Sequence, residues 1–166
     1  EYNPVTNAWT EKANFGGGNR YGAVGFSIGN KGYLGMGKNV DNLGNGPLYQ
    51  DFWEYNPVTN AWTEKANFGG GHRMFATGFS IGGKGYAGTG RGALPGNSVT
   101  YRNDLWEYNP VTNAWTEKAN LGIFGRSDAV GFSIGTKGYI GTGLISIPVG
   151  NNWNLQSSQD FWCYMP

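Results

Sequence analysis

The sequence has little of the side chains that build metal and redox sites. Its 166 residues include one cysteine, Cys163, and one histidine, His72. A single cysteine excludes an intramolecular disulfide and a cysteine-based zinc site within one chain, and one imidazole per chain cannot build a three-histidine zinc site. We therefore expect no metal and no cofactor.

Charged side chains are also scarce, at 14% of the residues, with a formal net charge of +1. Nucleic-acid binding needs a concentrated basic face, which this balance does not provide. Apolar stretches are interrupted within a few residues by Gly, Ser or Lys, so none is long enough for a transmembrane helix. We expect neither a nucleic acid nor a membrane as partner. The first residues, 1–4, resemble the middle of a repeat and not a signal peptide.

Glycine and aromatic residues are abundant instead, with 30 glycines and 16% Phe, Trp and Tyr. Disordered chains lack aromatic residues, which bury enough surface to offset the entropy lost on ordering. Glycine beside aromatic residues is typical of short strands joined by tight turns. The composition therefore predicts a folded chain of closely packed sheets.

An internal repeat determines the domain organisation. Residues 1–18 recur unchanged at 54–71, and the first fourteen of them recur from residue 107, so that copies start at 1, 54 and 107. The spacing between copies is 53 residues, except that Asp104 and Asp160 are 56 apart, which places a three-residue insertion in a variable segment. Repeats of this length indicate one domain over 1–166 that is built from stacked units.

Each unit is predicted to hold four strands. In the unit that spans residues 23–66, the predicted strands are 23–28, 33–37, 51–55 and 61–66. A variable loop lies at 38–50 and a Pro-containing turn at 56–60. No stretch of ten or more residues has a helical period. The chain is predicted to be all-β.

The repeated pattern is R-x5-F-S-I-G-x-K-G-Y-x-G-x-G, a loop, and then D-[FL]-W-E-Y-N-P-x-T-N-x-W. It resembles the kelch repeats that are common in bacterial surface and secreted proteins, and the resemblance covers nearly the whole chain. It implies a kelch-type β-propeller with three four-stranded blades, in which the first strand lines the central channel and the fourth lies at the rim. A secreted or cell-surface bacterial location is implied in the same way.

Three blades are fewer than the four to eight of a closed propeller. The terminal segments 1–13 and 160–166 complement each other. The first carries a fourth-strand sequence, and the second carries a third strand that no fourth strand follows. We expect a homodimer that closes a six-bladed ring and shares these strands. The alternative is that the chain is a fragment of a longer propeller.

Residues that recur in every unit favour a structural role over a catalytic one. Arg20, Arg73 and Arg126 precede the first strand of each unit, and they are expected either to form a ring of anion-binding guanidinium groups or to bridge blades through carbonyl and carboxylate groups. The recurring carboxylates are expected to be hydrogen-bond partners at strand starts and not glycosidase pairs: Asp51, Asp104 and Asp160, with Glu54 and Glu107. The recurring tryptophans are expected to pack the blades: Trp9, Trp53, Trp62, Trp106, Trp115 and Trp162.

The loops 38–50, 91–103 and 143–159 differ while their surroundings are nearly identical, and variable loops often carry function. In kelch propellers they share a face with the links that precede the first strands. That face is our candidate binding surface, with these residues: Arg20, Tyr21, Tyr49, His72, Arg73, Phe75, Tyr101, Arg126, Asp128 and Trp153.

The favoured function is a non-catalytic scaffold that presents these loops to a protein, a peptide or a glycan. One alternative is an enzyme of kelch-propeller type, an oxidase or a sugar epimerase, although the histidine ligands of the kelch-type copper oxidases are missing. Another is an engineered or recently amplified set of repeats without a selected ligand.

Overall fold

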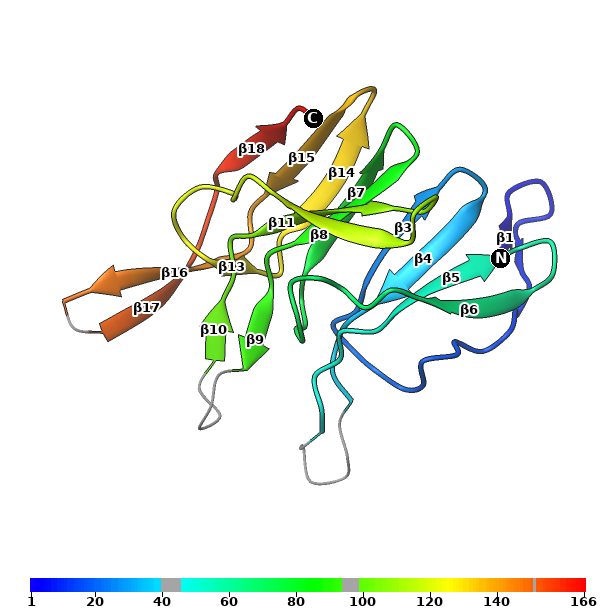
Figure 1. Ribbon diagram of the computed structural model, residues 1–166, viewed down its shortest axis with the longest axis horizontal. Coiled ribbons are helices and arrows are strands. Elements are labelled where there is room, and N and C mark those ends of the chain that lie inside the picture. The colour runs from blue at the N-terminus through cyan, green and yellow to red at the C-terminus, as the bar shows by residue number, and fades with distance from the viewer. Residues whose placement is uncertain (40–45, 94–98, 151) are drawn as a thin grey trace.

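The chain folds into antiparallel sheets that stand side by side in a row (Figure 1). We analysed a computed structural model that describes residues 1–39, 46–93, 99–150 and 152–166. These residues form strands, turns and loops without a helix, in agreement with the all-β prediction. Within the described ranges there is accordingly no helix long and apolar enough to cross a membrane.

Two of the sheets have four strands. The first sheet is ordered β3 (Val24–Ile28), β4 (Lys31–Gly35), β5 (Phe52–Asn56) and β6 (Ala61–Lys65). The second sheet is ordered β7 (Thr77–Ile81), β8 (Lys84–Gly88), β11 (Leu105–Asn109) and β12 (Ala114–Lys118). The registers repeat, so that Tyr33 lies opposite Glu54 and Tyr86 opposite Glu107.

The second strand of each sheet ends two residues earlier than predicted, at Gly35 in the first sheet. Met36 and Gly37 have φ values of 57° and 95°. This is the left-handed region, which a strand does not occupy. The same break recurs at Thr89 and Gly90 in the second sheet.

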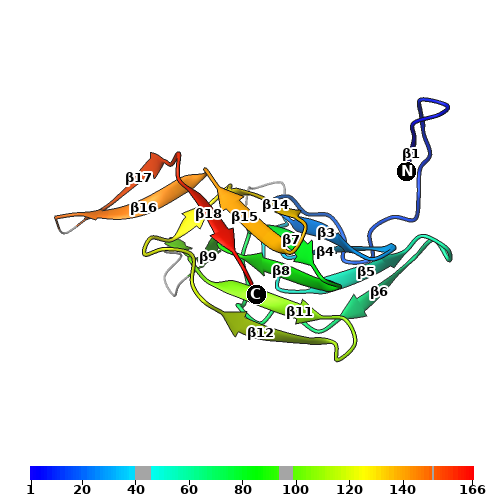
Figure 2. The same cartoon turned by 90° about the horizontal axis from the view of Figure 1, so that it is seen from above.

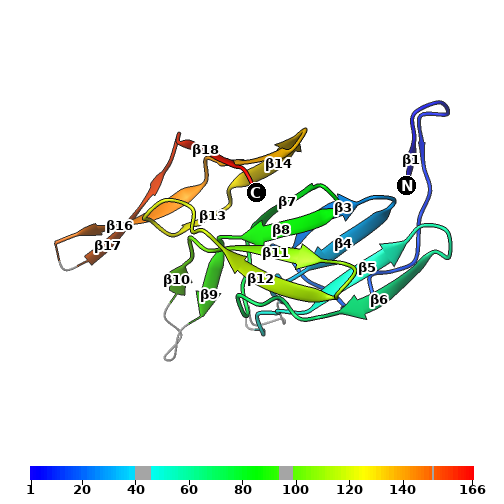
Figure 3. The ribbon, with the colours of Figure 1, turned by 45° about the horizontal axis from the view of Figure 1, so that its top comes forward.

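The third sheet contains β14 (Val130–Ile134), β15 (Lys137–Gly141) and β18 (Phe161–Tyr164). This sheet has three strands, as expected from the terminal strand 160–166, which lacks a following fourth-strand sequence. The matching fourth-strand sequence pairs as β2 (Ala8–Trp9) with β1 (Tyr2–Asn3), in a hairpin that stands apart from all three sheets (Figure 3).

Two of the loops that we predicted to be irregular contain extra hairpins. One pairs β9 (Arg91–Ala93) with β10 (Val99–Tyr101). The other joins β16 (Leu144–Val149) and β17 (Asn152–Ser157) to the short β13 (Arg126–Ser127), and it projects beyond the third sheet (Figure 2). The β-branched and aromatic residues of β10 (Val-Thr-Tyr) and of β16 (two isoleucines and a valine) favour strands. Residues 40–45, 94–98 and 151 of the predicted loops lie outside the described residues.

Neighbouring sheets pack by inserting a phenyl ring against glycines. A side chain on Gly78 or Gly85 of the second sheet would overlap the ring of Phe26 from the first sheet. Gly138 of the third sheet faces Phe79 of the second in the same way. At both interfaces between neighbouring sheets, a phenyl ring of one sheet therefore packs on glycines of the next.

The two outer faces of the row have no such partner. On the third sheet the apolar face that corresponds to Phe26 and Phe79 is exposed: Val130 (60%), Phe132 (42%), Ile134 (64%) and Phe161 (59%). On the first sheet, Gly25 and Gly32 meet only atoms of their own sheet. The row therefore ends in an apolar face on one side and a glycine face on the other.

Candidate functional site

The three recurring arginines are committed to ion pairs inside their own repeats. Both terminal nitrogens of Arg73 bond the carboxylate of Asp104, at 2.6 and 2.9 Å, and Nη1 also donates to the carbonyl of Thr89 at 2.9 Å. Arg20 repeats this arrangement with Asp51, and Arg126 with Asp160. Each arginine thus ties the link before a sheet to the loop before its third strand.

These guanidinium groups are not available to an external anion. The side chains of Arg20, Arg73 and Arg126 are only 4%, 1% and 3% exposed. The expected contacts to carboxylate and carbonyl groups are present, but they lie within one repeat, so these side chains neither bridge neighbouring blades nor form an open ring of donors. The indole Nε1 of Trp106 also donates to Asp104, at 2.9 Å, so the carboxylate is bonded from two sides.

A second recurring cluster joins Glu54 to Lys31 and Tyr33, each at 2.6 Å. Burial raises the pKa of Glu54, but the hydrogen bonds from Lys31 and Tyr33 outweigh it and hold this pKa below its usual value. Burial, reinforced by the bond to Glu54, raises the pKa of Tyr33. Glu107 repeats the cluster in the second sheet, whereas Cys163 stands at the same place in the third.

Four of the six recurring tryptophans pack as predicted between sheets and links. Trp62 and Trp115 stack edge-on against Phe15 and Phe68, with ring centroids 4.9 Å apart in both cases. Trp53 and Trp106 are half-buried. Trp162 lies against Gly122 as Trp106 lies against Gly69, but it stays 41% exposed, and Trp9 is 80% exposed in the N-terminal hairpin.

Part of the candidate face gathers at the inner ends of the sheets. Tyr21 and Phe75 contact each other with centroids 5.8 Å apart, and the guanidinium carbon of Arg91 lies 4.4 Å from the Phe75 ring. Asp128 lies 3.9 Å from Arg91 and donates its backbone N–H to the carbonyl of Phe75 at 3.2 Å. Tyr49 instead covers Arg20, at 4.3 Å, and His72 is exposed.

Two other predicted residues, Tyr101 and Trp153, line one pocket of about 690 Å³. It is bounded by strand β10, by the link that precedes the third sheet, and by strands β16 and β17. The link runs so close to β10 that a side chain on Gly125 would overlap the carbonyl of Tyr101. The Gly125 carbonyl accepts the N–H of Ser146 at 2.9 Å, which fixes the link to β16.

The lining of this aromatic pocket is uncharged. Three aromatic side chains, Tyr101, Phe124 and Trp153, share it with three polar ones, and none of the ten residues that line it carries a formal charge. Trp153 is 69% exposed. Such a lining suits an uncharged ligand that combines flat apolar surface with hydrogen-bonding groups. The residues are Val99, Thr100, Tyr101, Asn103, Ile123, Phe124, Gly125, Ser146, Trp153 and Leu155.

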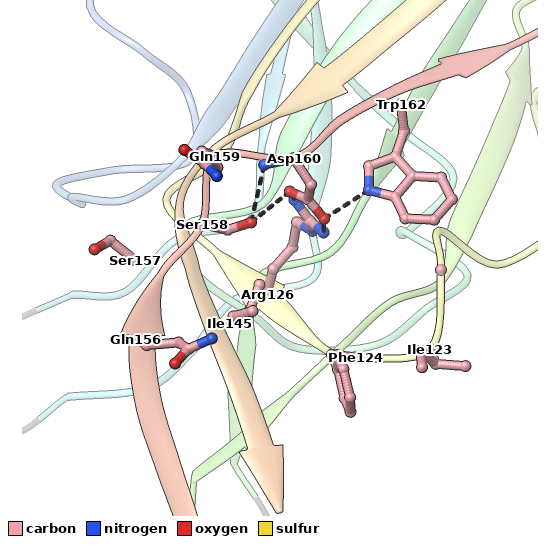
Figure 4. Close-up of a pocket in the computed structure, with 11 residues that line it drawn as sticks. Ile123, Phe124, Arg126, Ile145, Gln156, Ser157, Ser158, Gln159, Asp160 and Trp162 are labelled. Carbon is pink, nitrogen blue, oxygen red and sulfur yellow. Dashed lines mark hydrogen bonds and ion pairs between the residues drawn. The ribbon is translucent and has the colours of Figure 1, made fainter.

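A second hollow, of about 990 Å³, adjoins the aromatic pocket and shares Ile123 and Phe124 with it (Figure 4). Its only charged groups are Arg126 and Asp160, which neutralise each other. The hydrogen bond from Arg126, which outweighs burial, holds the pKa of Asp160 well below its usual value. The other polar side-chain groups of this hollow are the amides of Gln156 and Gln159, the hydroxyls of Ser157 and Ser158, and the indole N–H of Trp162.

Sequence reasoning missed Asn103, Ser146 and Leu155 as lining residues. The available signal was the link 121–125, where Leu-Gly-Ile-Phe-Gly replaces the Phe-Gly-Gly-Gly-His of the second repeat. The three-residue insertion after Tyr139 pointed to the same corner of the molecule. No group of three or more metal-ligating side chains occurs among the residues that the structure describes.

The repeated antiparallel sheets, with the first strand of each packed against the next sheet, correspond to about half of a kelch-type β-propeller. The solved structure of YjhT, a bacterial kelch-repeat propeller protein, matches 90% of this chain with a TM-score of 0.70 and 19% sequence identity. The chain spans 54% of YjhT, about half of its length. No family model and no curated protein matches the sequence.

Proposed function

We propose that this chain is a non-catalytic binding module that holds an uncharged ligand, a neutral glycan or an uncharged peptide segment, in the aromatic pocket. The observation that carries the proposal is the convergence of Tyr101, Phe124 and Trp153 from three separate segments around a cavity without formal charge. Aromatic side chains supply large contact area at a low cost in conformational entropy. The polar rim supplies hydrogen bonds that set orientation.

The commitment of the repeated carboxylates supports a role without catalysis. Asp51, Asp104 and Asp160 each bond an arginine and an indole, and Glu54 and Glu107 each bond a lysine and a tyrosine. A general acid or base must be free to reach a substrate proton. The ion pairs and hydrogen bonds of these carboxylates give them a structural role in each repeat, so a catalytic role is not needed to account for them.

Trp153→Ala is expected to weaken ligand binding by about thirtyfold, because loss of a central aromatic anchor costs roughly 2 kcal/mol or more. Arrays of neutral oligosaccharides and of uncharged peptides would identify a ligand, and isothermal titration calorimetry would give its Kd. The matched control is Val111→Ala, a 91% exposed residue in the turn between β11 and β12.

Equal Kd values for wild type, Trp153→Ala and Tyr101→Ala would contradict the pocket assignment. A stoichiometric transition metal found by elemental analysis would favour the enzyme hypothesis instead. Arrays with no binding at all would favour a set of repeats that has no selected ligand.

We further propose that two copies associate as a homodimer in which each contributes three blades to a six-bladed ring. The support is complementarity of the outer faces: Phe132 projects from one, while Gly25 and Gly32 line the other. Exposed apolar patches of this kind mark interaction surfaces. The match of the chain to about half of YjhT is consistent with half a ring.

Multi-angle light scattering at micromolar concentration is expected to give twice the chain mass of 18.0 kDa. A closed two-fold pair buries both outer faces, so no larger species is expected. A mass of 18.0 kDa at every concentration up to the millimolar range would overturn the dimer.

A further inference from the structure

Strand β17 forms one edge of the small sheet that it makes with β13 and β16. All six of its residues are exposed, and its hairpin with β16 projects away from the three larger sheets (Figure 1). A strand at the edge of a sheet presents backbone N–H and C=O groups that have no partner within the sheet. Such groups can bind another extended chain.

The hydrogen bonds of β16 show which backbone groups of β17 face outward. The N–H of Ser146 donates to the carbonyl of Gly125 at 2.9 Å, so the backbone of Ser146 points away from β17. Ser146 lies opposite Leu155, and Pro148 lies opposite Trp153. Because bonded and non-bonded pairs alternate in an antiparallel ladder, the N–H and C=O groups of Trp153 and Leu155 point away from β16. Among the described residues no backbone group bonds them, and we refer to these groups as the open edge.

The open edge lies beyond the point that a link reaches in the neighbouring repeat. There the link contacts the end of β10, where the N–H of Arg126 donates to the carbonyl of Arg102 at 2.9 Å. Ser158 is the counterpart of Arg102, 56 residues further on. The longer hairpin of β16 and β17 carries Trp153 and Leu155 past this point. A link placed as in the second repeat therefore leaves their backbone groups free.

The open edge carries none of the residues that usually prevent strand pairing. Proteins protect free edges with charged side chains or with proline. The outer strands β6 and β12 end in Glu-Lys, and the edge of β16 holds Pro148. Strand β17 reads Asn-Trp-Asn-Leu-Gln-Ser, without a charge or a proline. This edge is therefore suited to accept a further strand.

The residues of the open edge also belong to the aromatic pocket. The side chains of Trp153 and Leu155 line it and are 69% and 52% exposed. Opposed residues in neighbouring strands place their side chains on the same face, with Cβ atoms about 4.5–5.5 Å apart. Side chains of an added strand that oppose these two residues therefore stand at the rim of the pocket. Its uncharged lining suits apolar or uncharged polar side chains there.

We propose that the ligand is an extended, uncharged peptide segment that adds as a strand to the open edge and places alternate side chains at the aromatic pocket. Two alternate residues of the peptide each exchange a pair of main-chain hydrogen bonds, one with Trp153 and the other with Leu155. This inference rests on the proposed function, because it narrows the ligand of the aromatic pocket to a peptide.

A peptide matches this edge better than a glycan or a second copy of β17. The open edge presents a donor and an acceptor at every second residue, and main-chain pairing of this kind binds extended peptides. A sugar chain has no such regular series of donors and acceptors. In the proposed two-fold ring the third sheets of the two copies lie opposite each other, so their β17 strands do not meet.

Main-chain pairing can be tested with peptides that differ only in backbone methylation. An array of acetylated, amidated heptapeptides without charged residues would give a binder, and fluorescence anisotropy would measure its Kd. The alternate nitrogens of a bound strand form two sets, of which one faces the open edge. Methylation of two nitrogens in that set should weaken binding roughly thirtyfold, because two N–H donors are lost. Methylation of two nitrogens in the other set is the matched control and should leave Kd nearly unchanged.

Leu155→Pro removes one donor of the open edge from the protein. This N–H takes no part in the pairing of β17 with β16, and Pro148 already occupies an outward position of the same hairpin. We expect a Kd roughly tenfold higher than that of Leu155→Ala, which loses the side chain but keeps the N–H. Equal thermal unfolding temperatures for the two variants would show that the fold is kept.

The outcomes separate the open edge from the aromatic pocket. Equal Kd values for the two methylated sets, with a Kd that Trp153→Ala raises, would overturn strand addition and leave the pocket standing. Binding of neutral oligosaccharides but of no peptide would do the same. Absence of binding to either array would overturn both. A dimeric mass that Leu155→Pro reduces to 18.0 kDa would place a second copy at this edge and overturn the peptide ligand.

Discussion

Arg73→Ala is expected to lower the free energy of unfolding by about 3–5 kcal/mol, the usual cost of breaking a buried ion pair. The side chain is 1% exposed and bonds both oxygens of Asp104, whose own side chain is 16% exposed. Removing the arginine leaves this carboxylate partly buried without its cation. The carbonyl of Thr89 also loses its donor. Urea denaturation followed by tryptophan fluorescence would measure the change.

The repeats provide matched comparisons for this substitution. Arg126→Ala should cost less, because the side chain of Asp160 is 36% exposed and water can replace part of the lost interaction. Arg73→Lys should recover only part of the loss, since a lysine cannot bond both carboxylate oxygens in the same plane. Replacing the exposed Lys137 with alanine should change stability by less than about 0.5 kcal/mol. If Arg73→Ala also lowers the free energy of unfolding by less than about 0.5 kcal/mol, the structural role of the Arg73–Asp104 ion pair is refuted.

Gly85→Ala and Gly138→Ala are each expected to destabilise the chain by about 1–3 kcal/mol through overpacking. An added methyl group would overlap the Phe26 ring in one case and the Phe79 ring in the other. Neither glycine has a positive φ, so backbone strain does not contribute. The measurement is again equilibrium unfolding, at a fixed protein concentration.

Gly32→Ala is the third member of this series and should behave differently. Its nearest contact would be the Tyr55 Cβ of the same sheet at 3.7 Å, which is ordinary packing distance. The single chain should therefore keep its stability. If the Phe132 ring of a second copy packs there, the same cost of about 1–3 kcal/mol appears as a dimer Kd raised roughly 5- to 150-fold. Analytical ultracentrifugation would measure it, and an unchanged Kd would place Gly32 outside the interface.

Much of the fold could be predicted because the same sequence pattern occurs in three copies along the chain. The strands around Phe26, Phe52 and Trp62 alternate or end in glycine and proline turns, and their predicted bounds differ from the observed ones by at most one residue. The exception at Met36 has a physical reason. A non-glycine residue in the left-handed region is rare, and nothing in the local sequence announces it.

The site was less predictable, because its residues are set by segments that do not repeat. Tyr101 and Trp153 were found as aromatic residues in variable loops, and they meet in one pocket. Their meeting depends on two hairpins, β9 with β10 and β16 with β17, that the repeat does not contain. The arginines were ambiguous for the opposite reason. Recurrence alone does not tell whether a guanidinium group faces a carboxylate or solvent.

The phenyl-to-glycine packing gives the row of sheets a direction. Phe26 and Phe79 point the same way along it, so a chain offers a protruding flank at one end and a receiving flank at the other. If copies associate through these flanks, as proposed, they add head to tail, and the rotation per chain decides whether growth stops after two copies or continues as an open fibre. A substitution that widens the angle between two sheets is then expected to favour an open fibre over the closed pair.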